Sequence, residues 1–248
     1  DVKDPDAFPN SFEKYYNDNF PFRNACLKIY NRVNYHVLNK SPYPKKVLIG
    51  KDGWMFEADK EKKAWLGTNI PKDSVINLMI KELHNRAVAY QKKGIKFYFT
   101  IAPMKIEIYT ELAPKEIQKG IDSSCADKIA ARAKKDPLLH YIDMFTPMLK
   151  AKSLGWLYFK YDNHWNKLGG FIGYQEICKK IQKDFPVVVP HVIKDFTIGT
   201  ENAKNTNLAE MIGLDEDISN PEPVLKPSFA ATSSEGDLTG YNAPVGFP

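Results

Sequence analysis

The sequence of 248 residues lacks several features that mark special classes of protein. No run of apolar residues approaches the ~18 that a membrane-spanning helix needs, so we expect no such helix within it. There is no basic-then-apolar start, so we expect any secretion signal or anchor to lie upstream of this chain. Lysine and arginine (35) exceed aspartate and glutamate (30), but these basic residues are scattered, which argues against a nucleic-acid partner.

Cysteine is also scarce. Cys26, Cys125 and Cys178 show no CxxC spacing and are too few for a disulfide framework. Three thiols allow one disulfide but do not require it, so cysteine usage leaves the cellular compartment open. Cys26 and Cys178 fall on the apolar faces of expected helices, where we expect them to be small core residues.

What the chain does contain is an ordinary globular composition. Apolar residues make up 43% of it and charged residues 26%, which excludes a disordered or fibrous chain. Aromatic residues are abundant at 12%, which suits a large core and also suits a surface that stacks on sugar rings. Composition does not choose between these two uses.

The first sixty residues predict two helices and a hairpin. Helical spacing of aromatic residues predicts a helix over 8–19, and Pro21 separates it from a second over 22–37. Apolar segments at 47–49 and 54–56 flank a Gly-Lys-Asp-Gly turn, a pattern typical of a β-hairpin. In the second helix, one stripe is expected to face the core: Phe22, Cys26, Ile29, Val33 and Val37.

Helix and strand patterns alternate farther along the chain. Strands are expected over 95–101 and 138–142, and helices over 73–94, 123–134, 144–152 and 166–183. Such alternation predicts an α/β fold with a mainly parallel sheet flanked by helices. Ligand sites in these sheets lie at the carboxyl ends of strands, where we expect the loops at 103–105 and 162–164.

The whole chain, 1–248, is expected to form a single domain. An N-terminal helical segment (8–39) precedes the α/β core (46–190), and a loop-rich segment follows (191–248). Proline, serine and glycine dominate the last thirty or so residues, and a globular domain rarely stops in so loose a run. We therefore expect the C-terminus of the fold to be incomplete in this chain.

One histidine is the leading candidate for chemistry. His164 follows Asp162 by two positions, in a polar loop just before a helix. A carboxylate that accepts from Nδ1–H leaves Nε2 free as a base, and the flanking Tyr161 and Trp165 could exclude water and contact a substrate. The same pair could bind a metal, but no HExxH or Cys/His cluster supplies a third ligand, so we expect no metal. The other histidines read as surface or structural residues: His36, His84, His140 and His191.

Three strings together resemble a known family. They are FPNSFEKYYNDNFPFR at 8–23, VLIGKDGWMF at 47–56 and YDNHWN at 161–166. In this order and spacing they resemble the alginate O-acetyltransferase AlgJ/AlgX-type proteins, also described as the DHHW family. The resemblance covers residues 8 to 185, and Ala-Pro-Met-Lys at 102–105 is similar to that family's post-strand loop.

The resemblance implies an SGNH-hydrolase-like fold in the bacterial cell envelope. Such proteins are periplasmic or otherwise extracytoplasmic, in some cases tethered by an upstream N-terminal helix, and handle acetyl esters of exopolysaccharides or cell-wall glycans. In their Ser-His-Asp triad, Asp162 would orient the imidazole and His164 would be the general base. Lys105 and Trp165, like Tyr161, are expected neighbours of the substrate. A membrane-bound acyltransferase is the acetyl donor that the resemblance implies, and no cofactor is expected.

The nucleophile of this triad is not evident in the chain. The family's serine lies downstream of D-x-H-W in a strand-to-turn motif of the type Asp-Ser-Phe, which we do not find. No apolar strand leads into Ser228, and Ser233 and Ser234 stand in a polar, glycine-rich stretch, whereas a nucleophile needs a rigid support. Truncation of the chain explains this, and so does a family member that has lost the nucleophile; the loose C-terminal stretch favours truncation.

The sequence thus predicts an extracytoplasmic polysaccharide O-acetyltransferase or acetylesterase. One alternative is a non-catalytic glycan-binding or scaffold protein of the same fold. In that protein the aromatic residues around the loop would stack on sugars, although their simpler interpretation is that most of these rings belong to the core: Tyr158, Phe159, Tyr161 and Trp165. A weaker alternative is a metal-dependent hydrolase that uses Asp162 and His164.

Overall fold

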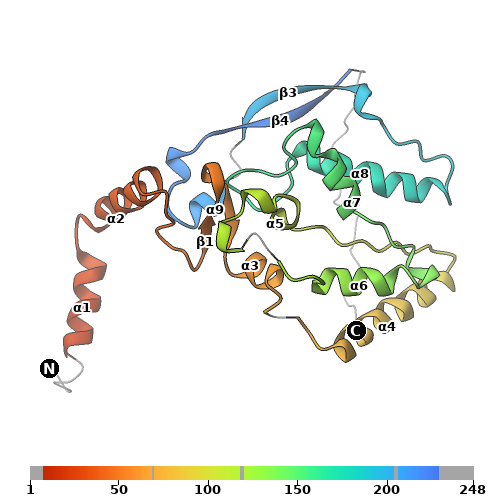
Figure 1. The fold of residues 1–248 in the computed structure, drawn as a ribbon, viewed down its shortest axis with the longest axis horizontal. Coiled ribbons are helices and arrows are strands. Elements are labelled where there is room, and N and C mark those ends of the chain that lie inside the picture. The colour runs from red at the N-terminus through yellow and green to blue at the C-terminus, as the bar shows by residue number, and fades with distance from the viewer. Residues whose placement is uncertain (1–7, 69, 118–119, 204–205, 229–248) are drawn as a thin grey trace, which may run out of the picture.

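The structure, a computed structural model, describes residues 8–68, 70–117, 120–203 and 206–228 (Figure 1). Two helices project from one side of a body in which helices surround extended segments. Within the described residues, no helix is both long enough and apolar enough to cross a lipid bilayer.

The two N-terminal helices form as predicted. α1 spans Phe8–Asn19 and α2 spans Arg23–Arg32, and a π-helical turn, Val33–Val37, continues α2. The chain changes direction at Pro21, which cannot donate the backbone hydrogen bond that a continuous helix needs.

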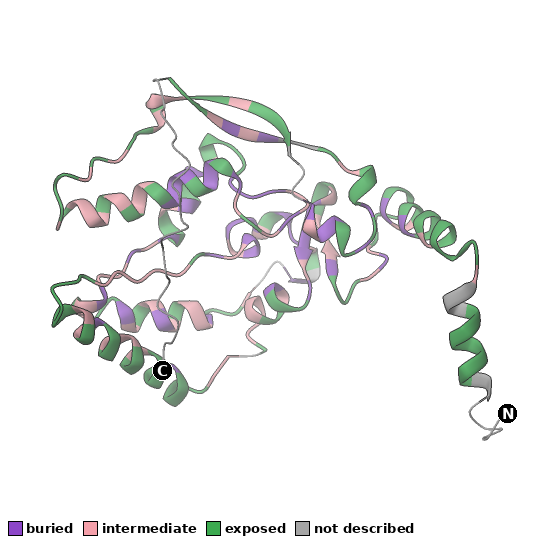
Figure 2. Cartoon of the chain, turned by 180° about the vertical axis from the view of Figure 1, so that it is seen from behind, coloured by how far each residue is buried: buried purple, intermediate pink, exposed green. Residues whose placement is uncertain are grey.

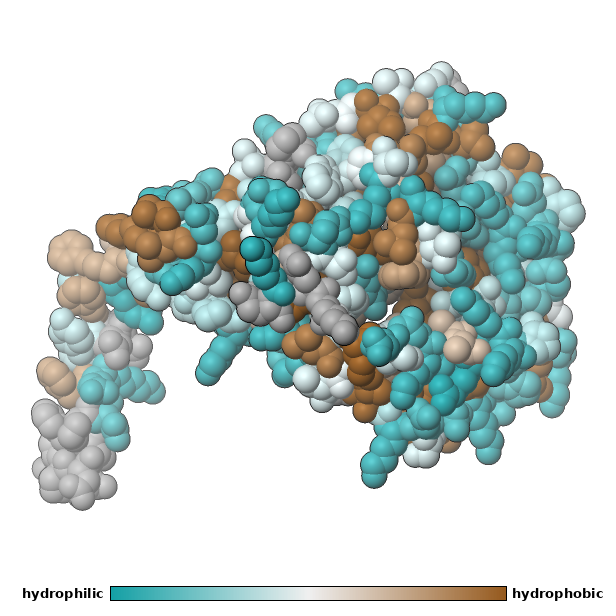
Figure 3. Space-filling view, viewed as in Figure 1, coloured by the Kyte–Doolittle hydropathy of each residue, from teal (hydrophilic) through white to brown (hydrophobic). Residues whose placement is uncertain are grey.

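The expected buried stripe of the second helix is wrong. α2 meets the body through Asn31, and the turn after it meets the body through Tyr35; both residues are buried. Cys26 is exposed rather than in the core, and Cys26, Cys125 and Cys178 are all free thiols. Figure 3 shows hydrophobic side chains gathered over α2. The predicted stripe faces solvent, with Phe22, Ile29, Val33 and Val37 all more than 40% exposed.

The predicted hairpin is confirmed. β1 (Val47–Ile49) and β2 (Met55–Glu57) pair antiparallel, with Leu48 opposite Phe56. In the turn between them, φ is +54° at Asp52 and +74° at Gly53, a conformation that aspartate and glycine tolerate best.

The remaining helices of the core lie close to their predicted places. Gly94, with φ of +73°, follows the end of α4 as expected. In Figure 1, α4 and α6 lie on one side of the extended segment 95–101, and α7 and α8 lie on the other. Two short helices, α3 and α5, were not predicted. The bounds are α3 Lys60–Trp65, α4 Asp73–Gln91, α5 Lys105–Ile108, α6 Cys125–Ala133, α7 Phe145–Ala151 and α8 Lys167–Gln182.

The parallel sheet is not confirmed. Segments 95–101 and 138–142 lie side by side in parallel, but they share only an isolated bridge between Thr100 and Ile142. The second segment begins as a 3-10 turn, Pro137–Leu139, and His140 has φ of +40°, so its backbone is not extended enough for a longer ladder. In the described part of the chain, the strands form two antiparallel pairs.

The segment after residue 190 is more ordered than predicted. β3 (Phe196–Ala203) and β4 (Asn220–Pro227) form an eight-residue antiparallel ribbon, and α9 (Asn207–Glu210) lies between them in the chain. β4 contains three prolines, which lack a backbone N–H and made the segment read as a loop. A two-stranded ribbon accepts them because both of its strands are edges. The prediction of a loop-rich segment over 191–248 did not include the strands over 196–203 and 220–227.

The main apolar cluster lies beneath the loop that carries Asp162 and His164. It includes Phe56 of β2, and Tyr109 and Tyr158, all at most 1% exposed. Figure 2 shows buried residues concentrated where the elements of the body meet. Tyr158 and Phe159 are core residues, so the stacking surface that the glycan-binding alternative assigned to them is wrong.

Candidate active site

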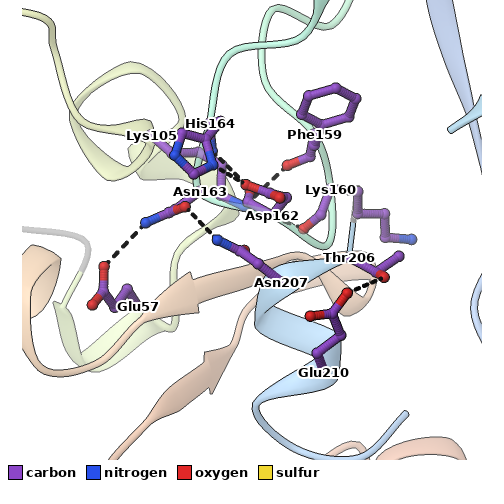
Figure 4. Close-up of polar contacts among 10 residues, drawn as sticks. All are labelled: Glu57, Lys105, Phe159, Lys160, Asp162, Asn163, His164, Thr206, Asn207 and Glu210. Atoms are coloured by element: carbon purple, nitrogen blue, oxygen red, sulfur yellow. Dashed lines mark hydrogen bonds and ion pairs between the residues drawn. The ribbon is translucent and has the colours of Figure 1, made fainter. Parts of the chain in front are cut away.

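The Asp162 and His164 side chains are in direct contact. Nδ1 of His164 lies 2.6 Å from Oδ1 of Asp162, and the backbone N–H of His164 donates to the same oxygen at 2.8 Å (Figure 4). Because a carboxylate only accepts, this contact places the imidazole proton on Nδ1 and leaves Nε2 with a lone pair. The Asp162 side chain is 6% exposed, whereas that of His164 is 71% exposed. The pair thus presents a potential base to solvent.

A short antiparallel contact shapes the loop around this pair. Tyr158 and Trp165 form an isolated bridge, and the N–H of Phe159 donates to the carbonyl of His164 at 3.2 Å. Asn166 then caps α8, because its side chain accepts from the N–H of Gly169 at 3.0 Å. The loop is therefore closed at its base and leads directly into a helix.

Lys105 lies beneath the loop rather than beside a substrate. Its side chain is fully buried, and Nζ donates to the carbonyl oxygens of Phe159, Lys160 and Asp162 at 2.7–3.2 Å (Figure 4). Burial lowers the pKa of Lys105 to about 8, although nearby carboxylates, Glu61 first, oppose the shift. The expected substrate contact of Lys105 is replaced by support of the loop backbone.

Glu61 is a second buried ionisable group of this region. It lies on α3 and is 5% exposed, and the N–H of Glu57 donates to it at 3.4 Å. Burial raises the pKa of Glu61 to about 7, against the attraction of the Lys105 ammonium. No sequence pattern indicates this burial, because Glu61 stands among three lysines, which is typical of a solvated face.

Trp165 and Tyr161 are partly buried on the body. Trp165 donates from Nε1 to the hydroxyl of Tyr158 at 2.5 Å, and its ring lies against Gly173 of α8. Tyr161 packs with the cluster around Val47 of β1. Substrate contact stays a prediction for both residues.

A chain of amides crosses the loop next to His164. Asn163 donates to Oε2 of Glu57 at 3.1 Å and accepts from Asn207 of α9 at 2.9 Å (Figure 4). The N–H of Leu208 also donates to the carbonyl of Tyr161 at 3.0 Å. Sequence reasoning missed Asn163, Glu57 and Asn207, since only the fold brings them together.

Two further polar contacts connect this region to the ribbon. Asn166 donates from Nδ2 to the carbonyl of Trp156 at 2.6 Å and to Oε2 of Glu222 on β4 at 3.3 Å. Glu222 is 4% exposed. The ribbon that the sequence did not predict therefore supports the first turn of α8.

The structure assigns no nucleophile to the pair. Ser228 follows β4, where its N–H donates to the carbonyl of Asp195, and Ser233 and Ser234 lie outside the described residues. In the ranges that the structure covers, no serine hydroxyl is hydrogen-bonded to His164. The same ranges contain no group of three His, Cys, Asp or Glu side chains placed to hold a metal ion.

Comparison with known proteins finds a family model and curated relatives that are described as acetyltransferases or O-acetylases. A family model described as "SGNH hydrolase-like domain, acetyltransferase AlgX" matches residues 47–243. The probable alginate O-acetylase AlgJ of Pseudomonas aeruginosa is 24% identical over 207 residues, covering 83% of this chain and 50% of the relative. The corresponding protein of Pseudomonas putida is 22% identical over 171 residues, covering 69% and 42%. This chain thus spans half or less of the length of these curated relatives.

A solved structure shares the fold. Bacillus cereus PatB1 with a sulfonyl adduct superposes with a TM-score of 0.52 at 19% identity, covering 73% of this chain and 55% of PatB1. At this identity the likeness concerns the fold alone. It agrees with the family match in placing the chain among SGNH hydrolase-like domains.

Proposed function

The chain belongs to the SGNH hydrolase-like family of the acetyltransferase AlgX, and from this membership we propose that it catalyses O-acetylation of a polysaccharide through a Ser-His-Asp triad. The observation that carries the proposal is the 2.6 Å contact between a buried Asp162 and an exposed His164. An exposed Nε2 with a fixed tautomer is the form of imidazole that acts as a general base.

The proposed reaction has two halves. In the first, Nε2 of His164 takes the proton of a serine hydroxyl while the serine oxygen attacks an acetyl ester; the donor alcohol leaves with that proton, and an acetyl-enzyme forms. In the second, Nε2 takes the proton of a sugar hydroxyl, which attacks the acetyl-enzyme, and serine recovers its proton. Asp162 stays ionised and stabilises the imidazolium in both halves. Attack by water instead would make the protein an acetylesterase.

The names of the relatives support a polysaccharide acceptor. Each curated relative given above is called a probable alginate O-acetylase. The sulfonyl adduct of PatB1 is consistent with a nucleophilic residue in a protein of this fold. An extracytoplasmic location and a membrane-bound acetyl donor stay predictions, which cell fractionation and co-purification would check.

The triad is tested by hydrolysis of an aryl acetate by the complete protein. We expect His164→Ala to lower kcat/KM by about 10³-fold or more, since the general base is lost. His84→Ala is a matched control, because His84 also contacts a carboxylate, Asp136, at 2.7 Å, and we expect it to retain full activity. Equal turnover by wild type and His164→Ala would refute the triad.

Labelling with an aryl sulfonyl fluoride identifies the missing nucleophile. We expect one serine of the wild type to be labelled and His164→Ala to react much more slowly, because the base activates the hydroxyl. Peptide mass spectrometry then locates this serine in the complete protein. Acetyl-glycan binding without labelling or turnover would support the non-catalytic alternative instead.

A further inference from the structure

A cavity opens beside the loop that carries the proposed base. Its volume is about 520 Å³, and it lies between α3, the end of β2 and the segment Pro103–Met104. Asn163, the residue before His164, forms part of its wall. We call this cavity the α3 groove. Its polar lining residues are Glu57, Asp59, Lys60, Glu61, Lys63 and Asn163.

The two lysines of the α3 groove are already neutralised. Nζ of Lys60 lies 3.8 Å from Oε1 of Glu57, and Lys63 is paired with Asp59. Both lysines are exposed, at 83% and 56% of the side chain, whereas the Glu57 side chain is 13% exposed. The Glu57 carboxylate therefore lies along the wall of the groove, whereas Lys60 and the Lys63–Asp59 pair lie toward solvent, since the Asp59 side chain is 62% exposed.

The charge of this lining is unfavourable for an anion. Three carboxyl groups and two ammonium groups line the groove, and the buried Lys105 ammonium that attracts Glu61 already donates to three carbonyl oxygens, so no positive charge is left over for a ligand. Burial raises the pKa of Glu61 to about 7 and so favours its neutral form. With Glu61 neutral, the two remaining carboxylates and the two ammonium groups of the lining sum to zero net charge. A carboxylate entering the groove would pass Asp59 at the rim and meet Glu57 at the wall, which disfavours binding.

The same groups are suited to hydroxyl groups. Glu57 uses Oε2 for Asn163, and its other oxygen has only the long contact to Lys60, so Oε1 can accept from a sugar hydroxyl. The bond from Asn163 also fixes the Glu57 side chain next to the loop of the proposed base. A sugar bound there would contact Asn163, the residue that precedes His164 in the chain.

We propose that the α3 groove is the acceptor subsite and that it takes uncharged sugar units rather than uronate units. The inference rests on the proposed function, and it separates this protein from relatives whose names refer to alginate, which is a polyuronate. The acceptor class is thus a neutral glycan of hexose or N-acetylhexosamine units.

Binding of two oligosaccharides of equal length tests the proposal. Isothermal titration calorimetry at low salt compares a neutral β-linked tetrasaccharide of N-acetylglucosamine with a tetrasaccharide of mannuronate. We expect the complete protein to bind the neutral ligand at least ~10-fold more tightly, since the uronate meets like charge. Tighter or equal binding of the uronate overturns the proposal, and so does a failure of both to bind at millimolar concentration.

A charge reversal shows whether the groove is responsible. Asp59→Lys places a cation on the rim of the α3 groove. We expect this variant to bind the uronate more tightly, so that the affinity ratio of the neutral over the uronate tetrasaccharide falls at least ~3-fold. Glu176→Lys makes the same change of charge on α8, where Glu176 pairs with Lys179, and is expected to leave the preference unchanged. An equal effect of both variants would show a general charge effect and overturn the proposal.

Failure of the proposed acceptor class and failure of the proposed function give different results in these two assays. Hydrolysis of an aryl acetate that depends on His164, together with preferred binding of the uronate, would reject only the acceptor class. Preferred binding of the neutral glycan without such hydrolysis would reject the chemistry and keep the groove.

Discussion

At the scale of single residues, Lys105 and Glu61 form an ionisable pair beneath the loop of the proposed active site. The Lys105 ammonium donates to the carbonyl oxygens of residues 159, 160 and 162, and the carbonyl of Lys160 also accepts from the backbone N–H of Met55. Glu61 adds a carboxyl group to the same buried region. The cost of burying charge is offset here by hydrogen bonds and attraction, so the protonation of either group affects stability.

The pKa of Glu61 predicts a pH dependence of stability. Its ordinary pKa is 4.5, and burial raises the value in the folded protein to about 7. Between these two pH values the folded state binds a proton that the unfolded state has lost. The contribution of Glu61 to the free energy of unfolding is therefore complete below pH 4.5 and falls as the pH rises toward 7. Glu61→Gln removes this titration.

Urea unfolding of wild type and Glu61→Gln, compared at about pH 5 and about pH 6.5, measures the effect. We expect the wild type to lose stability relative to the variant over this interval. The comparison of the two proteins cancels the other carboxylates, which titrate in both. A difference that does not change with pH would contradict the raised pKa of Glu61.

At the scale of elements, the first turn of α8 contains two neighbouring glycines whose surroundings differ. A Cβ on Gly169 would lie 2.1 Å from the carbonyl oxygen of Leu157, which is backbone and cannot move aside cheaply. A Cβ on Gly170 would meet nothing within 4 Å. Gly169 therefore permits the close approach of the segment before the loop, whereas Gly170 only weakens the helix.

Alanine substitution of the two glycines is expected to act in opposite directions. Gly169→Ala should destabilise the fold by about 1–3 kcal/mol, because the new methyl group overlaps the Leu157 carbonyl. Gly170→Ala should stabilise it by up to about 1 kcal/mol through helix propensity. Denaturant unfolding of each variant checks both values. Equal effects of the two substitutions would show that the contact at Gly169 is not tight.

At the scale of the whole molecule, the N-terminal helices project from the body (Figure 1). Phe12, Tyr15 and Tyr16 of α1 are all more than half exposed. α2 is held more firmly, because Arg32 forms a bidentate contact with Asp217 at 2.6 Å from each of two nitrogens. The body therefore extends to α2 but not to α1.

A truncation tests this boundary. Removal of residues 1–19 should change the Tm of the protein by no more than about 2 °C, since little buried surface is lost. Removal of residues 1–36 also takes away Asn31, Arg32 and the buried Tyr35, and is expected to lower the Tm clearly. Differential scanning calorimetry of both truncated proteins measures the two shifts. A large loss of Tm on the shorter truncation would show that α1 packs on the body.

Features that depend on neighbours in the chain could be predicted from the sequence. The turn at Asp52 and Gly53, the cap of α8 by Asn166 and the helix break at Pro21 each involve residues within a few positions. The contact of Asp162 with His164 belongs to the same class, since two positions in one loop determine it. Local geometry and hydrogen bonding suffice for all of them.

Features that depend on distant segments were decided by the tertiary structure. Lys105 reaches carbonyls 54 to 57 positions away, and Asn166 meets Glu222 at a separation of 56, so no local pattern reveals their burial. The parallel sheet was overpredicted, because the pattern of apolar residues indicates that a segment tends to be extended. It does not indicate that two such segments pair over several residues. The sequence by itself determined the N-terminal helices, the β1–β2 hairpin, the longer helices of the core and the proposed catalytic pair. The packing of those elements decided which charges are buried, because desolvation and long-range hydrogen bonds exist only once the chain has folded.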